Sequence, residues 1–188
     1  MDPTNSQYYI KNSNKYTKLL KQLDEGIKKS IETIPAENRK LLTYDDSWAY
    51  FAPRYGMKVI GAIQASDFSD PSPKDIAGLI DQVRSEKVPA IFASEVFPTN
   101  IVDQIAKEGN VTVVETLSDD DLPGDTGDNN HSYVGMMLDN MKNMIVPLGG
   151  SIDALKNIKP KKYYTYSIII RYMCFFNKIR IKLLSIQT

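Results

Sequence analysis

Between residues 40 and 150 the sequence alternates between short apolar runs and longer segments whose apolar residues recur at helical spacing. This alternation predicts strands at 40–44, 58–64, 88–93 and 111–117, and helices at 47–56, 72–87, 98–109 and 132–150. Strands that alternate with helices are typical of an open, mainly parallel sheet with helices on both faces. The predicted fold class is therefore α/β, with a four-stranded sheet flanked by helices.

A single long helix is predicted before the first strand, over residues 5–35. Its apolar residues recur every three or four positions, and charged and amide residues lie between them. Pro35 marks its expected end. The apolar positions are Tyr9, Tyr16, Leu20, Leu23, Ile27, Ile31 and Ile34.

The helix predicted at 72–87 carries a clear start signal. Ser72 suits the N-cap position, Pro73 the first helical position and Asp75 the third. The last predicted helix contains Met136, Met137, Met141 and Met144. Methionines at helical spacing usually fill a core, so we expect them to be buried rather than to bind a soft metal.

Charged residues are distributed unevenly along the chain, although its formal net charge is +0. Residues 160–188 contain six basic and no acidic residues, so all 23 acidic residues precede them beside 17 basic ones, a formal charge of −6. An acidic body argues against nucleic acid as a partner. We expect three parts: one long helix (1–36), an α/β body (37–158) and an atypical basic tail (159–188), which we interpret as sequence not selected for this fold.

Several classes of function lack sequence support. Cys174 is the only cysteine and His131 the only histidine, which excludes a multi-cysteine metal cluster and histidine-rich zinc catalysis within the chain. We expect His131 to be a loop or helix-start residue. No glycine-rich phosphate motif follows a strand, and no serine or cysteine has an evident base partner. The start of the chain lacks the pattern of a signal peptide, and no apolar run approaches the length of a membrane helix.

Oxygen-bearing side chains follow all four predicted strands. They are Asp45 and Asp46, Ser66 and Asp67, Ser94 and Glu95, and Asp119, Asp120 and Asp121. The carboxyl ends of parallel strands meet at one edge of a sheet, where ligands bind. Convergent carboxylates repel one another unless a cation or protons join them, which favours a metal site. The alternative is that they cap helices, with Asp46 or Ser47 capping the helix at 47–56.

Four stretches then resemble a known family: TYDDSWAYFAPRYGM (43–57), GAIQASDFSDPSPKDIAGLIDQVRSEKVPAIFASEVFP (61–98), LSDDDLPG (117–124) and HSYVGMM (131–137). They are similar to the metal-binding solute-binding proteins of ABC importers for zinc, manganese or iron. The resemblance covers residues 2 to about 158. It implies two α/β lobes with a metal ion between them, and makes the predicted N-terminal helix the one that joins the lobes.

The resemblance also implies a ligand set. It places metal ligands at Asp45, where many relatives have histidine, at Ser94 or Glu95, of which only Glu95 is able to ligate, and at Asp120, with Asp119 and Asp121 as register alternatives. The N-terminal lobe and its histidine have no counterpart, so we expect a truncated protein with poor affinity. An all-oxygen set shifts the preference from zinc toward manganese or iron(II).

The leading hypothesis is the substrate-binding component of a metal-ion ABC importer, which carries Mn²⁺, Zn²⁺ or Fe²⁺ and is not an enzyme. Its expected partners are the ion and the importer's permease, with no nucleic acid. We expect a monomer in the periplasm or at the cell surface, and the acidic loop 118–130 closing over the ion or meeting the permease. The alternatives are a structural remnant that binds nothing and a flavodoxin-like enzyme that uses paired carboxylates as acid and base.

Overall fold

The computed structural model describes residues 3–44, 47–64, 71–93, 99–114 and 117–160. Its centre is a four-stranded sheet in which every strand pair is parallel, in the order β2-β1-β3-β4. The strands are β1 (Lys40–Thr43), β2 (Lys58–Ala62), β3 (Ala90–Phe92) and β4 (Thr112–Val114). The predicted α/β class and the number of strands are confirmed.

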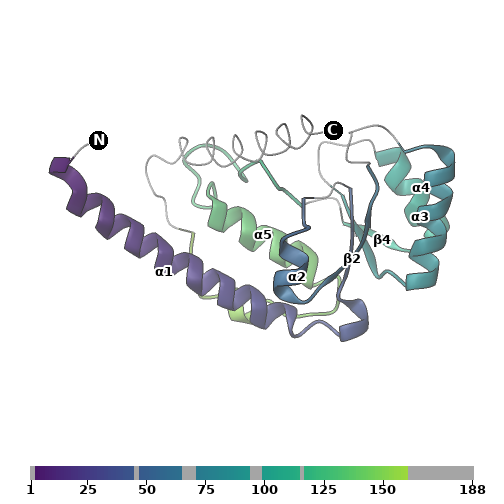
Figure 1. Cartoon of the computed structure of the whole chain (residues 1–188), viewed down its shortest axis with the longest axis horizontal. Helices are drawn as coiled ribbons and strands as arrows, with labels where there is room; N and C mark the ends of the chain where they lie inside the picture. Colours follow the sequence, from purple (N-terminus) through teal and green to yellow (C-terminus); the bar gives the residue numbers. More distant parts are fainter. Residues whose placement is uncertain (1–2, 45–46, 65–70, 94–98, 115–116, 161–188) are drawn as a thin grey trace, which may run out of the picture.

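Helices cover both faces of this sheet (Figure 1). The α-helices are α1 (Ser6–Ile31), α2 (Phe51–Tyr55), α3 (Pro73–Glu86), α4 (Thr99–Gly109) and α5 (Tyr133–Ile145). Short 3₁₀ turns lie at Pro3–Asn5, Ala36–Asn38 and Asp153–Leu155. Helices α3 and α4 pack on one face, and α1, α2 and α5 lie on the other. Within the described residues, none of the helices is both long enough and apolar enough to cross a membrane.

Each face of the sheet contributes side chains to its own apolar cluster, because successive side chains of a strand point in opposite directions. In β1, Leu41 packs toward α1 and α5, whereas Leu42 packs toward α3 and α4. In β3, Phe92 and Ile91 divide in the same way. All four side chains are at most 1% exposed. A strand that is buried on both faces has a continuous apolar sequence, and for this reason these strands could be predicted from the sequence.

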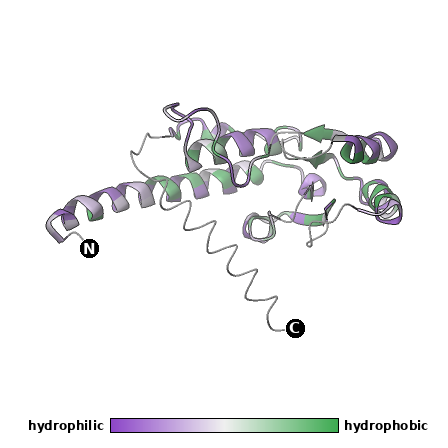
Figure 2. Cartoon of the chain, turned by 90° about the horizontal axis from the view of Figure 1, so that it is seen from above, coloured by the Kyte–Doolittle hydropathy of each residue, from purple (hydrophilic) through white to green (hydrophobic). Residues whose placement is uncertain are grey.

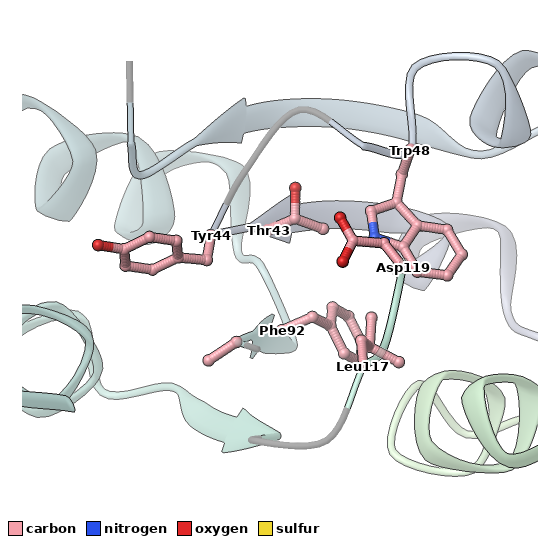
Figure 3. A pocket seen from close by; sticks show the side chains of 7 residues that line it. Thr43, Tyr44, Trp48, Phe92, Leu117 and Asp119 are labelled. Carbon is pink, nitrogen blue, oxygen red and sulfur yellow. The ribbon is translucent and has the colours of Figure 1, made fainter. Parts of the chain in front are cut away.

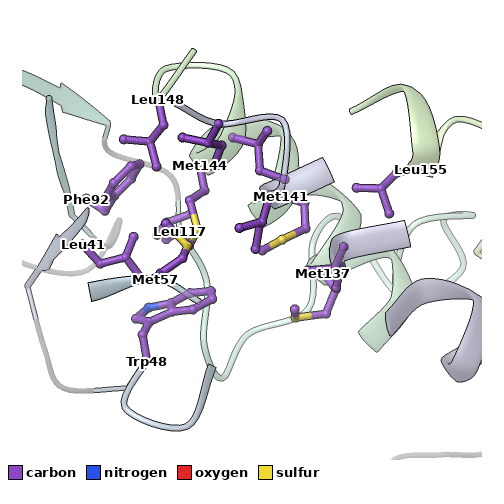
Figure 4. Close-up of a cluster of buried hydrophobic side chains, with 14 of the residues drawn as sticks. Leu41, Trp48, Met57, Phe92, Leu117, Met137, Met141, Met144, Leu148 and Leu155 are labelled. Atoms are coloured by element: carbon purple, nitrogen blue, oxygen red, sulfur yellow. The ribbon is translucent and has the colours of Figure 1, made fainter. Parts of the chain in front are cut away.

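The methionines of α5 lie in the larger cluster, as predicted. Met141 and Met144 are fully buried, and Met136 and Met137 are nearly so. Figure 4 shows this cluster, with the side chains of Met137, Met141 and Met144 between Phe92 and Trp48 on one side and Leu155 on the other.

The C-terminal half of α1 belongs to the same core. Leu19, Leu23, Ile27 and Ile31 are buried in the larger cluster, whereas Tyr8, Tyr9 and Ile10 are more than half exposed. Figure 2 shows the corresponding change along the helix, whose first turns extend away from the rest of the molecule. The predicted linking helix is thus anchored in the lobe by its second half.

Two helix boundaries differ from the sequence prediction. Helix α1 ends at Ile31, before Pro35, and the next turns are closed by hydrogen bonds such as that of the Thr33 hydroxyl to the Ser30 carbonyl, at 2.6 Å. The helix expected at 47–56 comprises only Phe51–Tyr55, after a turn over residues 47–50. The predicted start of α3 is confirmed, with Ser72 as its N-cap. Ser72 and Asp75 also form a capping box: the Ser72 hydroxyl accepts from the Asp75 N–H, and the Asp75 carboxylate accepts from the Ser72 N–H.

A polar clamp joins α1 to α2. Asp24 accepts two hydrogen bonds from the Arg54 guanidinium, at 2.8 and 2.5 Å, and one from the Tyr55 hydroxyl at 2.7 Å. These bonds hold the pKa of Asp24 below its ordinary value, first through Arg54 and then through Tyr55. Burial and the bond to Asp24 raise the pKa of Tyr55 to about 12, so its hydroxyl remains a donor at physiological pH.

Replacing Met144 with alanine should reduce the free energy of unfolding by roughly 2–5 kcal/mol, because it removes a fully buried side chain and leaves a cavity. Urea denaturation at pH 7 measures the loss. Val146→Ala, one residue beyond α5 and 52% exposed, is the control and should change stability by less than about 0.5 kcal/mol. Equal losses in the two variants would contradict the assigned core.

Replacing Asp24 with asparagine should weaken the α1–α2 clamp, by less than about 1 kcal/mol because the pair is partly exposed. A carboxylate with a lowered folded pKa stabilises the protein above its unfolded pKa of 3.8, and this stabilisation is lost as pH falls through the folded value. The difference between wild type and Asp24→Asn should therefore become smaller as the pH falls below 3.8, as measured by urea denaturation between pH 7 and pH 3. Glu25→Gln, on the same helix, is the control for loss of charge. A difference independent of pH would exclude the clamp as its cause.

Candidate metal-ion site

The carboxyl ends of the strands converge at one edge of the sheet, as the parallel topology requires. Backbone hydrogen bonds extend the pairing beyond the strands: the Tyr44 N–H donates to the Phe92 carbonyl at 3.0 Å, and the Ala93 N–H to the Val114 carbonyl at 2.9 Å. The Leu117 N–H then donates to the Ala93 carbonyl at 3.3 Å. Tyr44, Ala93 and Leu117, described residues that follow β1, β3 and β4, therefore lie side by side at this edge.

A small cavity of about 10 Å³ lies at this edge. That volume is at the lower limit for one water molecule or a small ion. Figure 3 shows the Asp119 carboxylate beside the Trp48 indole and the Thr43 hydroxyl, whereas the Tyr44 ring points away toward the other face. The cavity is lined by Thr43, Tyr44, Trp48, Phe92, Ala93, Leu117 and Asp119.

Asp119 is connected directly to the segment that follows β1. The Ser47 hydroxyl donates a hydrogen bond to Oδ2 of Asp119, across 72 residues of sequence. The expectation that Ser47 caps the following helix is wrong: the N-cap of α2 is Tyr50, without a side-chain cap bond. Ser47 lies in a turn before that helix, so its hydroxyl is available to the neighbouring loop.

Asn140 holds the backbone beside Asp119. Its side-chain carbonyl accepts from the Ser118 N–H at 2.9 Å, and its side-chain amide donates to the Ser118 carbonyl at 2.7 Å. Asn140 is 1% exposed, in a helix whose inward face is otherwise mostly apolar. The two bonds satisfy both backbone polar groups of Ser118 and so fix the backbone at the start of the loop 118–130.

Asp120 lies next to two other carboxylates, Asp119 and Asp121. Partial desolvation raises the pKa of Asp120, and the negative charges of Asp119 and Asp121 raise it further. A carboxyl group in this setting gains from any positive charge that approaches it. The local electrostatics therefore favour cations at the start of the loop 118–130.

His131 braces this loop. Its Nδ1 lies 3.2 Å from the carbonyl oxygens of both Pro123 and Gly124, so a protonated Nδ1 donates to the loop backbone. This contact fits the predicted loop role. The loop ends at Ser132, the N-cap of α5, whose hydroxyl accepts from the Gly135 N–H at 3.1 Å.

The predicted ligands are only partly placed. Asp120 and its register alternatives Asp119 and Asp121 lie in the described loop after β4, whereas Asp45 and Glu95 lie outside the described residues. Other predicted strand-end residues, namely Asp46, Ser66, Asp67 and Ser94, also lie outside them. Within the described ranges, no three histidine, cysteine, aspartate or glutamate side chains are grouped so as to hold a metal ion.

Neither Ser47 nor Asn140 was predicted to contribute to this edge. A signal existed for Asn140, because it is a polar residue between Met137 and Met144 on the buried side of α5. A polar residue that interrupts an apolar stripe usually has a buried hydrogen-bond partner. Ser47 gave no comparable signal, because its bond depends on how two distant loops meet.

Open parallel α/β domains bind their ligands at the carboxyl ends of the strands, where Asp119, Asp120 and Asp121 lie in this chain. Comparison with known proteins identifies the family. The model of the family described as the periplasmic component A of the zinc-uptake complex matches residues 1–145. The chain belongs to this family of metal-binding solute-binding proteins of ABC transporters.

Curated relatives support this assignment. The manganese ABC transporter substrate-binding lipoprotein PsaA of Streptococcus pneumoniae is 27% identical over 141 residues, which are 75% of this chain and 45% of PsaA. The zinc-binding protein TroA of Treponema pallidum is 29% identical over 150 residues, 78% of this chain and 49% of TroA. The iron-binding protein YfeA of Yersinia pestis is 28% identical over 126 residues, 67% of this chain and 40% of YfeA. The chain thus spans about half the length of these relatives.

The fold agrees with a solved relative. The structure of the periplasmic zinc-binding protein TroA from Treponema pallidum superposes with a TM-score of 0.69 at 26% identity. The match covers 78% of this chain and 54% of the TroA chain. The resemblance predicted from the sequence is confirmed.

Replacing Asn140 with leucine should reduce the free energy of unfolding by roughly 1–3 kcal/mol, because the Ser118 N–H and carbonyl lose their side-chain partners. Urea denaturation of the metal-free protein measures the loss. Asp139→Leu, an exposed neighbour on the same helix, is the matched control and should have little effect. A loss no larger than that of the control would show that Asn140 does not hold the loop.

Proposed function

We propose that this chain forms the C-terminal lobe and linking helix of an extracytoplasmic substrate-binding component of an ABC importer, and that it carries a divalent transition-metal ion. Membership of the family supports this proposal, as do the names of relatives that bind manganese, zinc or iron. The structural observation that most strongly supports the proposed metal site is the Ser47–Asp119 hydrogen bond. It brings the segment after β1 and the segment after β4 to the same edge.

The proposed ligands are Asp45, Glu95 and one aspartate of the loop after β4. The sequence favours Asp120 as that aspartate. The geometry favours Asp119, because it lines the cavity at the strand ends and is tied to Ser47, two residues after Asp45. Asp120 would then add negative charge next to the ligand.

The donor set fits a hard or borderline divalent cation. Mn²⁺ and Fe²⁺ are well suited to carboxylate oxygen ligands, whereas Zn²⁺ is commonly held by nitrogen and sulfur ligands. The ion is the cargo of the protein, and no chemical reaction is proposed for it. A set of about three carboxylates leaves the ion partly hydrated, so we expect weak binding.

The partners and organisation follow from the family and remain proposals for this chain. They are the permease of the importer, reached through the loop 118–130, and a periplasmic or cell-surface location for a monomeric protein. We also propose that residues 1–36 act as the linking helix, that residues 37–158 form the metal-binding lobe and that residues 159–188 are not part of the fold.

Calorimetric titration of the full chain with Mn²⁺ and Zn²⁺ tests this function. Wild type should bind about one ion, and Asp45→Ala and Glu95→Ala should weaken binding at least tenfold, since each removes a charged ligand. Asp119→Asn should weaken it more than Asp120→Asn if Asp119 is the third ligand. Asp139→Asn, an exposed aspartate of α5, is the control for loss of one negative charge.

Thermal unfolding gives an independent measurement. Ion at about 100 times its dissociation constant should stabilise wild type by roughly 2.7 kcal/mol and should stabilise the ligand variants less. A wild type that shows neither heat of binding nor thermal stabilisation with Mn²⁺ or Zn²⁺ would instead support the structural remnant. Equal heats in wild type and in all ligand variants would refute the ligand assignment.

A further inference from the structure

Two residues outside the proposed ligand set constrain Asp119 and its neighbour. The Asp119 carboxylate accepts a hydrogen bond from Ser47, and Asn140 bonds the backbone of Ser118, the residue before Asp119. The first contact comes from the turn before α2 and the second from α5.

We infer that Ser47 and Asn140 are positioning residues that orient Asp119 toward a metal ion at the strand edge. This inference rests on the proposed function and adds to it two residues that are not themselves ligands. Ser47 acts through the carboxylate, and Asn140 acts through the backbone of Ser118.

The hydrogen-bonding capacity of a carboxylate permits this arrangement. An ionised aspartate offers two oxygens with about four acceptor positions, and a serine hydroxyl donates one proton. Ser47 occupies one of these positions on Oδ2, so the carboxylate keeps acceptor positions with which it can bind a cation. Outer partners of this kind fix the orientation of ligating carboxylates in metal sites, and their loss typically costs about 10–100-fold in affinity.

Trp48 packs beside this carboxylate. Its ring is 8% exposed, lines the same cavity as Asp119 and lies beside the Asp119 carboxylate (Figure 3). The Ser47–Asp119 hydrogen bond itself is exposed to solvent. This bond ties the loop after β4 to the turn that precedes α2.

The test compares Ser47→Ala with Ser47→Thr in calorimetric titrations of the full chain with Mn²⁺. Ser47→Ala should weaken binding about 10–100-fold. Ser47→Thr keeps a hydroxyl and should restore most of the affinity, which a merely structural role would not predict. Ser85→Ala, an exposed serine of α3, is the matched control and should bind as wild type does.

Two further measurements separate positioning from folding and from ligation. The thermal midpoint of the metal-free protein should change by no more than about 2 °C in Ser47→Ala, because Ser47 is exposed. In an Asp119→Ala background, Ser47→Ala should cause no additional loss of affinity, because the residue through which it acts is gone.

The outcomes are distinguishable. If wild type binds no ion, the proposed function fails and the positioning role falls with it. If wild type binds and Asp119→Ala is impaired, but Ser47→Ala binds as tightly as wild type, the function stands and the positioning role is overturned. An additional loss from Ser47→Ala in the Asp119→Ala background, or normal binding by Asp119→Ala, also overturns it.

Discussion

The parallel pairing of four short strands between two apolar layers determines where the other parts of this protein lie. Leu41 and Leu42, adjacent in β1, enter separate clusters on opposite faces, and Phe92 and Ile91 of β3 repeat the pattern. A parallel sheet needs a crossover connection after each strand, so helices must cover both faces. All carboxyl ends then lie at a single edge, where acidic side chains accumulate.

Negative charge is concentrated at this edge, and two features reduce the repulsion between the carboxylates. Ser47 satisfies part of the Asp119 carboxylate with a hydrogen bond, while Asp120, between two other aspartates, has a raised pKa because of desolvation and its neighbours' charges. Both are responses to carboxylates brought close together without a compensating positive side chain in the described part of the loop. A divalent cation would relieve the same repulsion more completely.

Much of the fold was predictable from the sequence, for definite physical reasons. Leu41, Leu42 and Ile91 belong to short apolar runs, which are typical of strands buried on both faces. The Ser72–Asp75 capping box is a local interaction encoded within four residues. Helix boundaries were less predictable, because α2 begins at Phe51 after a turn shaped by tertiary contacts. The location of the site at the carboxyl ends of the strands was predictable, but the contacts between its residues were not. Ser47 meets Asp119 only because β1 and β4 flank β3, an order that the sequence does not reveal.

The central claim is that the strand edge beside Asp119 holds a metal ion through oxygen ligands. Anomalous diffraction from crystals grown with Mn²⁺ tests it most directly, because the scattering of the ion identifies both the element and its position. The account predicts one anomalous peak at the carboxyl ends of β1, β3 and β4, within roughly 2.0–2.6 Å of an Asp119 oxygen, the range of bond lengths for hard divalent cations. A peak elsewhere on the chain, or no peak at saturating Mn²⁺, would contradict it.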